Sequence, residues 1–147
     1  MENIDVILEK IQNEIFKKQD IYNADIEKYS NMLREDMSKI VDLEAYVLSK
    51  RQILLYEIGK YGSKILTDQK HIDKKMKERF EYYATQYNIK TNSGEKNILI
   101  NSDLADFIQK IKIYENYVGY LRESIKTLDQ IIWAIKYKIE VLNLGLE

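Results

Sequence analysis

Residues 102–143 read SDLADFIQKIKIYENYVGYLRESIKTLDQIIWAIKYKIEVLN, and this stretch decides the fold. Apolar residues recur in it at alternating steps of three and four over more than five heptads. A 3.5-residue repeat of this length predicts a helix that packs lengthwise against other helices. The seam, which we expect to join subunits, comprises Leu104, Phe107, Ile111, Tyr114, Val118, Leu121, Ile125, Leu128, Ile132, Ile135, Ile139 and Leu142.

A second apolar stripe follows the side of this predicted helix. It comprises Ile113, Tyr117, Tyr120, Ser124, Ile131, Ala134 and Val141. A helix with two apolar faces lies between neighbours, and one of about 60 Å is too long for a single small globule to cover. We therefore expect one face to contact the same subunit and the other to contact sister subunits. A long hairpin within a monomer or a simple dimer is the alternative.

The composition predicts an all-α protein. The 147 residues suffice for one domain, and they include no proline and only five glycines, so helix breakers are few. We expect long helices in a helical hairpin or coiled-coil arrangement. Within this single domain, we assign 1–97 to an N-terminal helical region with a basic segment and 98–147 to the long C-terminal oligomerisation helix.

Few residues are suited to catalysis. The only histidine is His71 and there is no cysteine, which excludes a Cys–His pair and the usual zinc sites. The stretch Gly59-Lys60-Tyr61-Gly62 is too short for a phosphate-binding loop. The carboxylates alternate with lysines, as on solvated helix faces. We therefore expect no enzyme activity, no cofactor and no metal, with His71 exposed on a helix.

Neither a membrane span nor a secretion signal is expected. No apolar run approaches 18 residues, and the start MENIDVILEK is acidic and lacks the basic opening of a signal peptide. With no cysteine as well, an intracellular location is the default expectation.

The apolar spacing predicts where the other helices lie. Residues 3–18 suit a short amphipathic helix capped by Asn3 and followed by a break over 20–25. We expect this helix to fold onto the core, and binding to a partner is the alternative. A second long helix is expected from Asn23 or Asp25 to a glycine stop at Gly59. The polar residues 88–95 predict a loop. Asn101 or Ser102 is expected to cap the last helix.

The segment 60–79 is strongly basic within a chain whose net charge is −1. It holds seven lysines or arginines against three acidic residues, and the rings of Phe80, Tyr82, Tyr83 and Tyr87 follow it. Cations that hold phosphates beside rings that stack on bases are what single-stranded nucleic acid requires. A solvated helix whose rings face the core is the alternative. A ring of subunits would multiply the basic patch and strengthen a weak electrostatic binder.

Residues 110–140, KIKIYENYVGYLRESIKTLDQIIWAIKYKIE, resemble the C-terminal region of the UvsY family, the recombination mediators of T-even-like phages. The family pattern there is roughly K-I-K-Y-Y, then Y-L, I-K and I-K-x-x-I-E. Upstream, Glu27-Lys28-Tyr29-Ser30 is similar to the start of the family's long helix. The resemblance covers 26–145 and is strongest after residue 97. The matching residues are Lys110, Ile111, Lys112, Tyr114, Tyr120, Leu121, Ile125, Lys126, Ile135, Lys136, Ile139, Glu140 and Gly145.

The family also has a basic-aromatic motif, roughly [KR]-x-R-L-x-Y-Y-x-G-[KR], that is tied to binding of single-stranded DNA. Counting from Tyr29 without gaps places it at residues 51–60, RQILLYEIGK, with Ile53 where the family has Arg and Glu57 where it has the second Tyr. Residues 76–83, MKERFEYY, match more letters but lie some twenty residues later and lack the Gly-Lys ending. The register favours the first segment, and the second stays open.

The resemblance implies a small helical protein that assembles into a hexameric or heptameric ring and binds single-stranded DNA without sequence preference. It implies a mediator, without cofactor or catalysis, that helps a phage RecA-type recombinase to replace the single-strand-binding protein in the cytoplasm of the infected bacterial host. A structural or adaptor coiled-coil protein with no nucleic-acid role is the alternative. The expected DNA-binding residues are Lys50, Arg51, Tyr56, Lys60, Lys64, Lys74, Lys75, Lys77, Arg79, Tyr82 and Tyr83.

Overall fold

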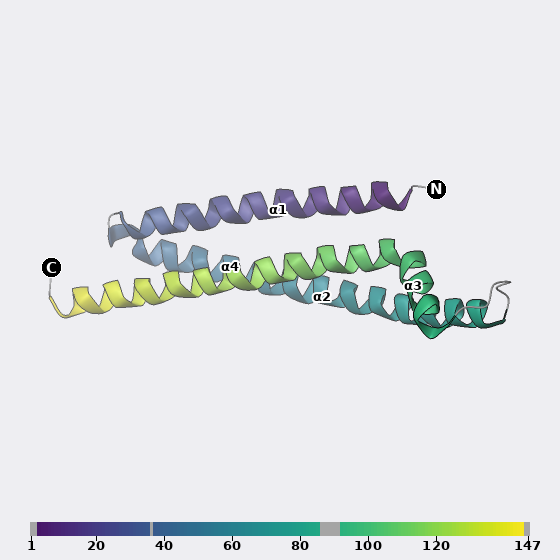
Figure 1. Ribbon diagram of the computed structural model, residues 1–147. Coiled ribbons are helices and arrows are strands. Elements are labelled where there is room, and N and C mark those ends of the chain that lie inside the picture. The colour runs from purple at the N-terminus through teal and green to yellow at the C-terminus, as the bar shows by residue number, and fades with distance from the viewer. Residues whose placement is uncertain (1–2, 36, 86–91, 146–147) are drawn as a thin grey trace.

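The computed structural model describes residues 3–35, 37–85 and 92–145, which form an elongated all-α bundle (Figure 1). The elements are α1 (Ile4–Leu33), the short 3₁₀ helix η1 (Met37–Lys39), α2 (Ile40–Thr85), α3 (Ser93–Asp103) and α4 (Ala105–Asn143). Helices α1 and α4 run in one direction and α2 runs in the other, so the two ends of the chain lie at opposite ends of the bundle. The prediction of an all-α fold is confirmed.

Helix α1 is longer than its sequence pattern suggests. The side chain of Asn3 accepts a hydrogen bond from the backbone N–H of Asp5, as expected for an N-cap. The predicted break over 20–25 is wrong, because the buried stripe continues through Tyr22 to Tyr29. Burial of these rings on one face keeps the chain helical where local composition alone suggests a turn.

The chain reverses between the end of α1 at Leu33 and the start of α2 at Ile40. The prediction placed one continuous helix here, starting at Asn23 or Asp25, and that prediction is wrong. The ammonium group of Lys138, on α4, donates a hydrogen bond to the carbonyl oxygen of Leu33 at the end of α1. This contact satisfies a carbonyl that the helix itself leaves without a partner, so α4 stabilises the end of α1.

Helix α2 spans 46 residues, or about 70 Å at 1.5 Å per residue. The predicted stop at Gly59 is wrong, because the helix continues through both Gly59 and Gly62. A glycine stop requires a left-handed conformation, and among the glycines of the described chain only Gly145 has a positive φ, of 67°. Gly145 follows Leu144, the C-cap of α4, at the position where a left-handed residue commonly ends a helix.

Helix α3 and the start of α4 replace the single predicted helix start near Ser102. Asn92 and Glu95 form a capping box, in which each side chain accepts a hydrogen bond from the other residue's backbone N–H. The predicted loop over 88–95 is therefore wrong for residues 93–95, which belong to α3. Residues 88–91 lie outside the described residues. Buried Leu104 separates α3 from α4, so the predicted cap residues Asn101 and Ser102 lie inside α3 instead.

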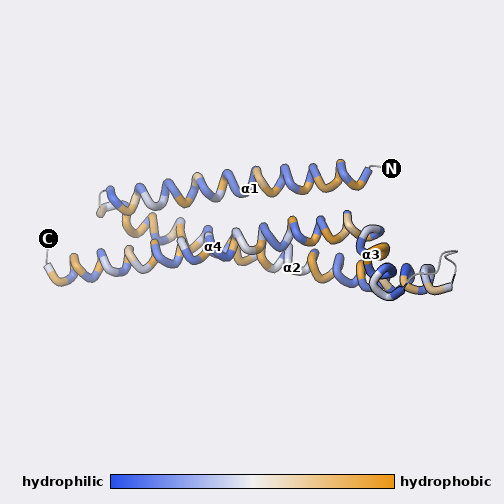
Figure 2. Tube along the Cα trace, viewed as in Figure 1, coloured by the Kyte–Doolittle hydropathy of each residue, from blue (hydrophilic) through white to orange (hydrophobic). Residues whose placement is uncertain are grey.

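Both apolar faces of α4 are covered within the chain. Figure 2 shows hydrophobic and hydrophilic positions alternating along each long helix. Helix α4 packs most extensively on α2 and also against α1, so Leu121, Leu128 and Ile135 are fully buried. The second stripe of α4 meets α1, where the hydroxyl of Tyr120 donates to Gln19 O at 3.1 Å and to Asn23 Oδ1 at 2.6 Å. The second stripe is therefore covered by α1 of the same chain, a 30-residue helix.

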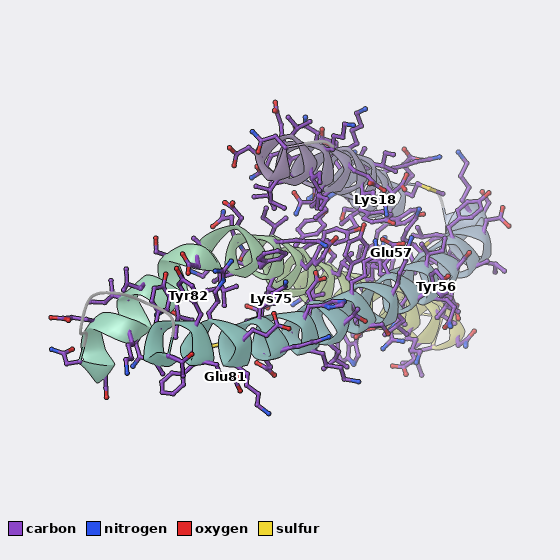
Figure 3. All side chains as sticks on the ribbon, turned by 90° about the vertical axis from the view of Figure 1, so that its right-hand side faces the viewer. Lys18, Tyr56, Glu57, Lys75, Glu81 and Tyr82 are labelled. Atoms are coloured by element: carbon purple, nitrogen blue, oxygen red, sulfur yellow. The ribbon has the colours of Figure 1, made fainter. Side chains whose placement is uncertain are left out.

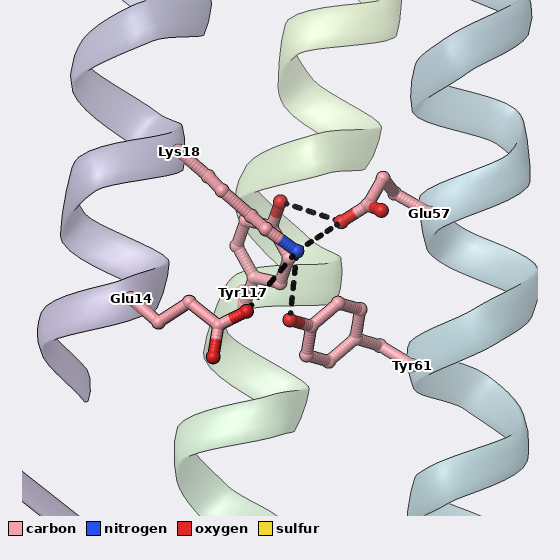
Figure 4. Close-up of polar contacts among 5 residues, drawn as sticks. All are labelled: Glu14, Lys18, Glu57, Tyr61 and Tyr117. Carbon is pink, nitrogen blue, oxygen red and sulfur yellow. Dashed lines mark hydrogen bonds and ion pairs between the residues drawn. The ribbon is translucent and has the colours of Figure 1, made fainter. Parts of the chain in front are cut away.

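A buried polar cluster interrupts the apolar core midway along the three long helices (Figure 4). Lys18 Nζ on α1 lies 3.2 Å from Glu57 Oε2 on α2, and it donates a hydrogen bond to the hydroxyl of Tyr61 at 3.1 Å. The hydroxyl of Tyr117 on α4 donates to the same Glu57 oxygen at 3.1 Å. All three long helices therefore meet at one carboxylate.

The ionisation of this cluster follows from its burial. Burial lowers the pKa of Lys18, but the hydrogen bonds to Tyr61 and Glu57 outweigh that effect and raise its pKa overall. Burial raises the pKa of Tyr117, and nearby Tyr22 and Glu57 raise it further. Lys18 is therefore charged and Tyr117 neutral at pH 7, which is the pairing that the Glu57 carboxylate requires.

Candidate nucleic-acid interface

The eleven predicted DNA-binding residues all lie on α2, but they do not form one patch. From Lys50 to Tyr83 the helix advances by about 50 Å. Successive residues are rotated by about 100°, so the eleven side chains point in several directions. In Figure 3, Lys75 lies on the side of α2 toward α1, whereas Glu81 lies on the side away from it.

Four of the predicted cations pair with carboxylates of the chain itself. Lys50 Nζ lies 2.7 Å from Asp25 Oδ2 on α1, and its side chain is only 15% exposed. Arg51 Nε lies 2.7 Å from Asp129 Oδ1 on α4. Arg79 lies 3.9 Å from Asp103, and Lys75 lies 3.7 Å from Glu78. The pairs of Lys50, Arg51 and Arg79 join different helices, which gives these three residues a role in the fold.

Lys64 contacts rings rather than carboxylates. Its Nζ lies 4.6 Å from the ring centroid of Tyr61 and 5.7 Å from that of Tyr114. Both rings are buried, and the Lys64 side chain closes over them as in a cation–π contact. Lys64 therefore caps the core between α2 and α4.

The remaining predicted cations form an outward stripe together with Lys70. Lys60, Lys70, Lys74 and Lys77 are exposed, and no ion pair joins any of them to another residue of the described chain. They recur at steps of three and four with exposed polar residues between them, so they share one face of α2. We call this face the basic stripe; it comprises Tyr56, Lys60, Ser63, Thr67, Lys70, Lys74 and Lys77.

Tyr56 is the exposed ring of the basic stripe, with 70% of its surface accessible. Lys60 is the next stripe residue, one helical turn further along. Glu78 and Glu81 are acidic residues just beyond Lys77, and the basic stripe ends there. The stripe thus offers four cations along most of the segment 60–79 and one ring just before it.

The tyrosines at the end of α2 are partly used by the fold. The rings of Tyr82 and Tyr83 meet edge to face at 5.1 Å between centroids. The hydroxyl of Tyr83 donates to Asp103 Oδ2 at 2.7 Å, and its ring packs against the small core around Ile72 and Ile100. Tyr82 stays exposed beside this pair. Tyr87, named with these rings, lies outside the described residues.

Two residues absent from the predicted set extend the basic-aromatic surface. Lys70 lies in the basic stripe, and the signal for it was its spacing of four residues from Lys74. Lys96 on α3 places its Nζ 5.7 Å from the ring centroid of Phe80, which is half exposed on α2. The Lys96 contact depends on how α3 folds back onto α2, and no local pattern encodes it.

The predicted oligomerisation seam lies largely inside the single chain. Eight of its twelve residues are buried: Leu104, Ile111, Tyr114, Val118, Leu121, Ile125, Leu128 and Ile135. Ile132, Ile139 and Leu142 are half-buried, and Phe107 is exposed. Packing on α2 and α1 accounts for this burial without a second subunit. The role of the seam between subunits stays a prediction.

His71 is exposed on α2, as predicted. Within residues 3–35, 37–85 and 92–145, no group of three or more His, Cys, Asp or Glu residues is arranged to hold a metal ion. In the same residues, no helix combines the length and the apolar character needed to cross a membrane. No family model matches the chain, and neither a curated protein nor a solved structure is significantly similar to it.

Proposed function

We propose that the protein binds single-stranded DNA without sequence preference and acts as a recombination mediator. The observation that supports this most is the basic stripe of α2. Four exposed lysines and Tyr56 follow one helical face, and no ion pair joins these lysines to a carboxylate of the described chain. Lysines that neutralise phosphates bind any sequence, and a ring stacks on any base.

The stripe suggests how a strand is held. Lys60 to Lys77 spans about 25 Å of rigid helix. Phosphates would follow the lysines while a base stacks on Tyr56. In a ring-like homo-oligomer, the stripes of several subunits would add and could bend or wrap the strand. The mediator role, with the RecA-type recombinase and the single-strand-binding protein as partners, comes from the resemblance of residues 110–140 to the UvsY family.

The test is oligo-dT binding followed by fluorescence anisotropy at several salt concentrations. Replacing Lys60, Lys70, Lys74 and Lys77 with Gln should weaken binding and reduce the slope of log affinity against log salt, because fewer counterions are released. The matched control replaces Lys17, Lys28, Lys112 and Lys136 with Gln. These lysines are exposed on α1 and α4, so the net charge changes equally while the stripe stays intact.

The outcome separates two functions. Loss of affinity in the stripe variant alone supports a DNA interface on α2. Equal losses in both variants would mean diffuse attraction by charge. No salt-dependent binding by the unchanged protein would favour a structural or adaptor protein without a nucleic-acid role, which the heptad repeats of α4 also suit.

The mediator role needs its own assay. Recombinase filaments form slowly on DNA that is covered by single-strand-binding protein. Adding this protein should shorten the lag before the recombinase's DNA-dependent ATP hydrolysis, and the stripe variant should not. If the protein binds DNA but does not shorten the lag, it is a DNA-binding protein and the proposed mediator role is wrong.

A further inference from the structure

Two adjoining hollows lie between α2 and α4, near the start of α1. The first has a volume of about 300 Å³, and we call it the Lys64 hollow; it is lined by Ser63, Lys64, Thr67, Asp68, Lys110 and Tyr114. The second has a volume of about 400 Å³, and we call it the Phe107 hollow; it adds Ile4, Ile7, His71, Lys75 and Phe107. Thr67, Asp68 and Lys110 line both hollows, so one ligand can extend from the first into the second.

Two lysines approach the same tyrosine ring in the Lys64 hollow. Lys64 Nζ on α2 lies 5.7 Å from the ring centroid of Tyr114, and Lys110 Nζ on α4 lies 5.8 Å from the same centroid. Both lysine residues are only partly exposed. Two helices therefore bring ammonium groups to one hollow, where partial removal from water strengthens their attraction for an anion.

The charges that line the two hollows do not cancel. Lys110 Nζ lies 3.4 Å from Asp68 Oδ1, so these two charges offset each other. Lys75 lies 3.7 Å from Glu78 in a pair that is more than half exposed. No ion pair joins Lys64 to a carboxylate within the described part of the chain. Three lysines and one aspartate line the hollows, so the lining favours an anion.

The Lys64 hollow also contains polar groups that the fold does not use. The hydroxyl of Thr67 donates to Ser63 O at 3.0 Å, whereas the hydroxyls of Ser63 and Tyr114 form no hydrogen bond to another described residue. Asp68 has one buried oxygen, Oδ2, that accepts no hydrogen bond from the described chain. Ammonium and hydroxyl donors are the groups that bind the oxygens of a phosphate.

The Phe107 hollow suits a flat apolar group. Ile4 and Ile7 of α1 line it from one helix, and Phe107 of α4 lines it from another. The Phe107 residue is 41% exposed, so its ring is available to a ligand. Aromatic rings prefer to pack against other rings, and a nucleobase is such a ring. The two hollows together thus match a ligand with a phosphate at one end and a base at the other.

We propose that the two hollows bind a nucleoside phosphate monoester, with the phosphate held by Lys64 and Lys110 and the base against Phe107. A phosphate monoester carries a charge of about −1.5 to −2 at pH 7, which suits two ammonium groups. The ligand has two possible sources, a free mononucleotide or the phosphorylated end of a DNA strand. Ser63 and Thr67 belong to both the Lys64 hollow and the basic stripe, so a strand on the stripe could place its end there. Only this second source rests on the proposed function.

Calorimetric titration with thymidine 5′-monophosphate, in the absence of DNA, tests the site. The unchanged protein should bind this nucleotide at least about ten-fold more tightly than thymidine, because thymidine lacks the charged group that the lysines hold. Lys64→Gln should weaken binding of the nucleotide by about ten-fold. The matched control Lys112→Gln removes the same charge from an exposed position on α4 and should leave the affinity unchanged.

Phe107→Leu tests the half of the site that holds the base. It should weaken binding of thymidine 5′-monophosphate several-fold more than binding of inorganic phosphate, because only the nucleotide has a base. Circular dichroism should stay helical, since Phe107 is partly exposed. Equal affinities for the nucleotide and for inorganic phosphate would overturn the assignment of a nucleoside.

Two other results would overturn the site itself. The first is no binding of thymidine 5′-monophosphate at concentrations up to about 10 mM, where even weak contacts form. The second is an equal loss of affinity in Lys64→Gln and Lys112→Gln, which would mean diffuse attraction by charge. A protein that binds the nucleotide but no oligo-dT would keep this site and lose the proposed function.

Anisotropy measurements separate the two sources of the ligand. An oligo-dT with a 5′-phosphate is compared with an oligo-dT that is one nucleotide longer and has hydroxyl ends, so that both carry the same number of phosphate groups. Tighter binding of the phosphorylated strand, lost in Lys64→Gln, would assign the site to a strand end. Equal binding of the two strands, together with binding of the nucleotide, would assign the site to a free mononucleotide.

Discussion

Lys18 Nζ on α1 lies 3.2 Å from Glu57 Oε2 on α2, in the middle of an otherwise apolar bundle. The Glu57 side chain is 9% exposed, and Tyr117 of α4 donates to the same oxygen. Heptad patterns allow helices to slide by seven residues without losing apolar contact. A single buried ion pair removes that freedom, because any slide would leave a buried charge without its partner.

Removing one member of this pair should therefore be costly. Lys18→Met leaves the Glu57 carboxylate with Tyr117 as its main partner, and we expect the free energy of unfolding to fall by about 2–3 kcal/mol. The double variant Lys18→Met/Glu57→Leu should cost less than Lys18→Met alone, because no charge stays buried. Urea denaturation gives the free energy of unfolding of Lys18→Met, of Glu57→Leu and of the double variant. If the loss in the double variant equals the sum of the losses in the two single variants, the two residues are not coupled.

Alkaline pH should destabilise the fold through its buried tyrosines. Burial raises the pKa of Tyr114 to about 12, from 10.0 for a free tyrosine, and the nearby Asp68 carboxylate adds to the effect. The folded chain thus holds this proton more tightly than the unfolded chain does. The stabilisation that this proton gives the folded state is complete below pH 10 and is lost as the pH rises toward about 12.

Tyr114→Phe isolates this effect, since phenylalanine keeps the ring and removes the ionisable hydroxyl. Between pH 10 and 12, the free energy of unfolding of this variant should decline less steeply than that of the unchanged protein. Urea denaturation at a series of pH values supplies the comparison. Identical slopes would mean that Tyr114 does not ionise on unfolding in this range.

Arg51 and Lys60 should differ as DNA contacts, although both belong to the segment favoured by the register of the family motif. Arg51 pairs with Asp129 at 2.7 Å, whereas Lys60 projects from the basic stripe. Lys60→Ala should therefore weaken oligo-dT binding more than Arg51→Ala. Anisotropy at low salt gives the two affinities; a larger loss with Arg51→Ala would mean that DNA displaces Asp129.

Arg51→Ala should have only a small effect on stability. The pair is partly exposed, and such pairs contribute at most about 1 kcal/mol. Thermal denaturation of Arg51→Ala and Asp129→Ala should show similar, small losses in the free energy of unfolding. A loss of several kcal/mol would mean that the ion pair stabilises the packing of α2 on α4 far more than an exposed ion pair normally does.

Leu121→Asp should unfold the chain rather than release intact monomers. Leu121 is fully buried between helices of the same chain, and an aspartate there would be a charge without a partner. Circular dichroism should show loss of helix at 25 °C. A helical monomer would instead place Leu121 in a contact between subunits, as the seam prediction had it.

Periodicity revealed the helices but not the reversal of the chain. The steps Leu33, Met37, Ile40 and Leu43 keep the helical spacing straight through the turn at 34–39, and this turn has no glycine or proline. The chain reverses because α1 packs on α4, and Lys138 meets Leu33 across 105 positions. No window of local sequence contains that contact.

The candidate interface was predictable by position but not by direction. The basic composition of 60–79 located it on α2, and the spacing of Lys70, Lys74 and Lys77 was visible in the sequence. Lys50 and Arg51 have the same chemistry, yet they pair with Asp25 and Asp129 on other helices. Which cations remain free depends on where the acids of α1 and α4 come to lie.

The two faces of α4 illustrate the same limit. Its seams correctly indicated two neighbours, but a sequence pattern does not say whether a neighbour belongs to the same chain. Tyr120 meets Gln19 and Asn23 of α1, so the second neighbour is internal. An exposed apolar stripe lies instead on α2, at Val41, Leu48, Leu55 and Leu66.

Trp133 gives the molecule a built-in optical reporter. It is the chain's only tryptophan, it is 71% exposed near the end of α4, and its ring lies parallel to that of Tyr137 with centroids 6.2 Å apart. Because the indole is already in contact with water, its emission should change little when an isolated chain unfolds. A blue shift would instead signal that another molecule has covered this end of the bundle, so a single spectrum can tell docking apart from folding.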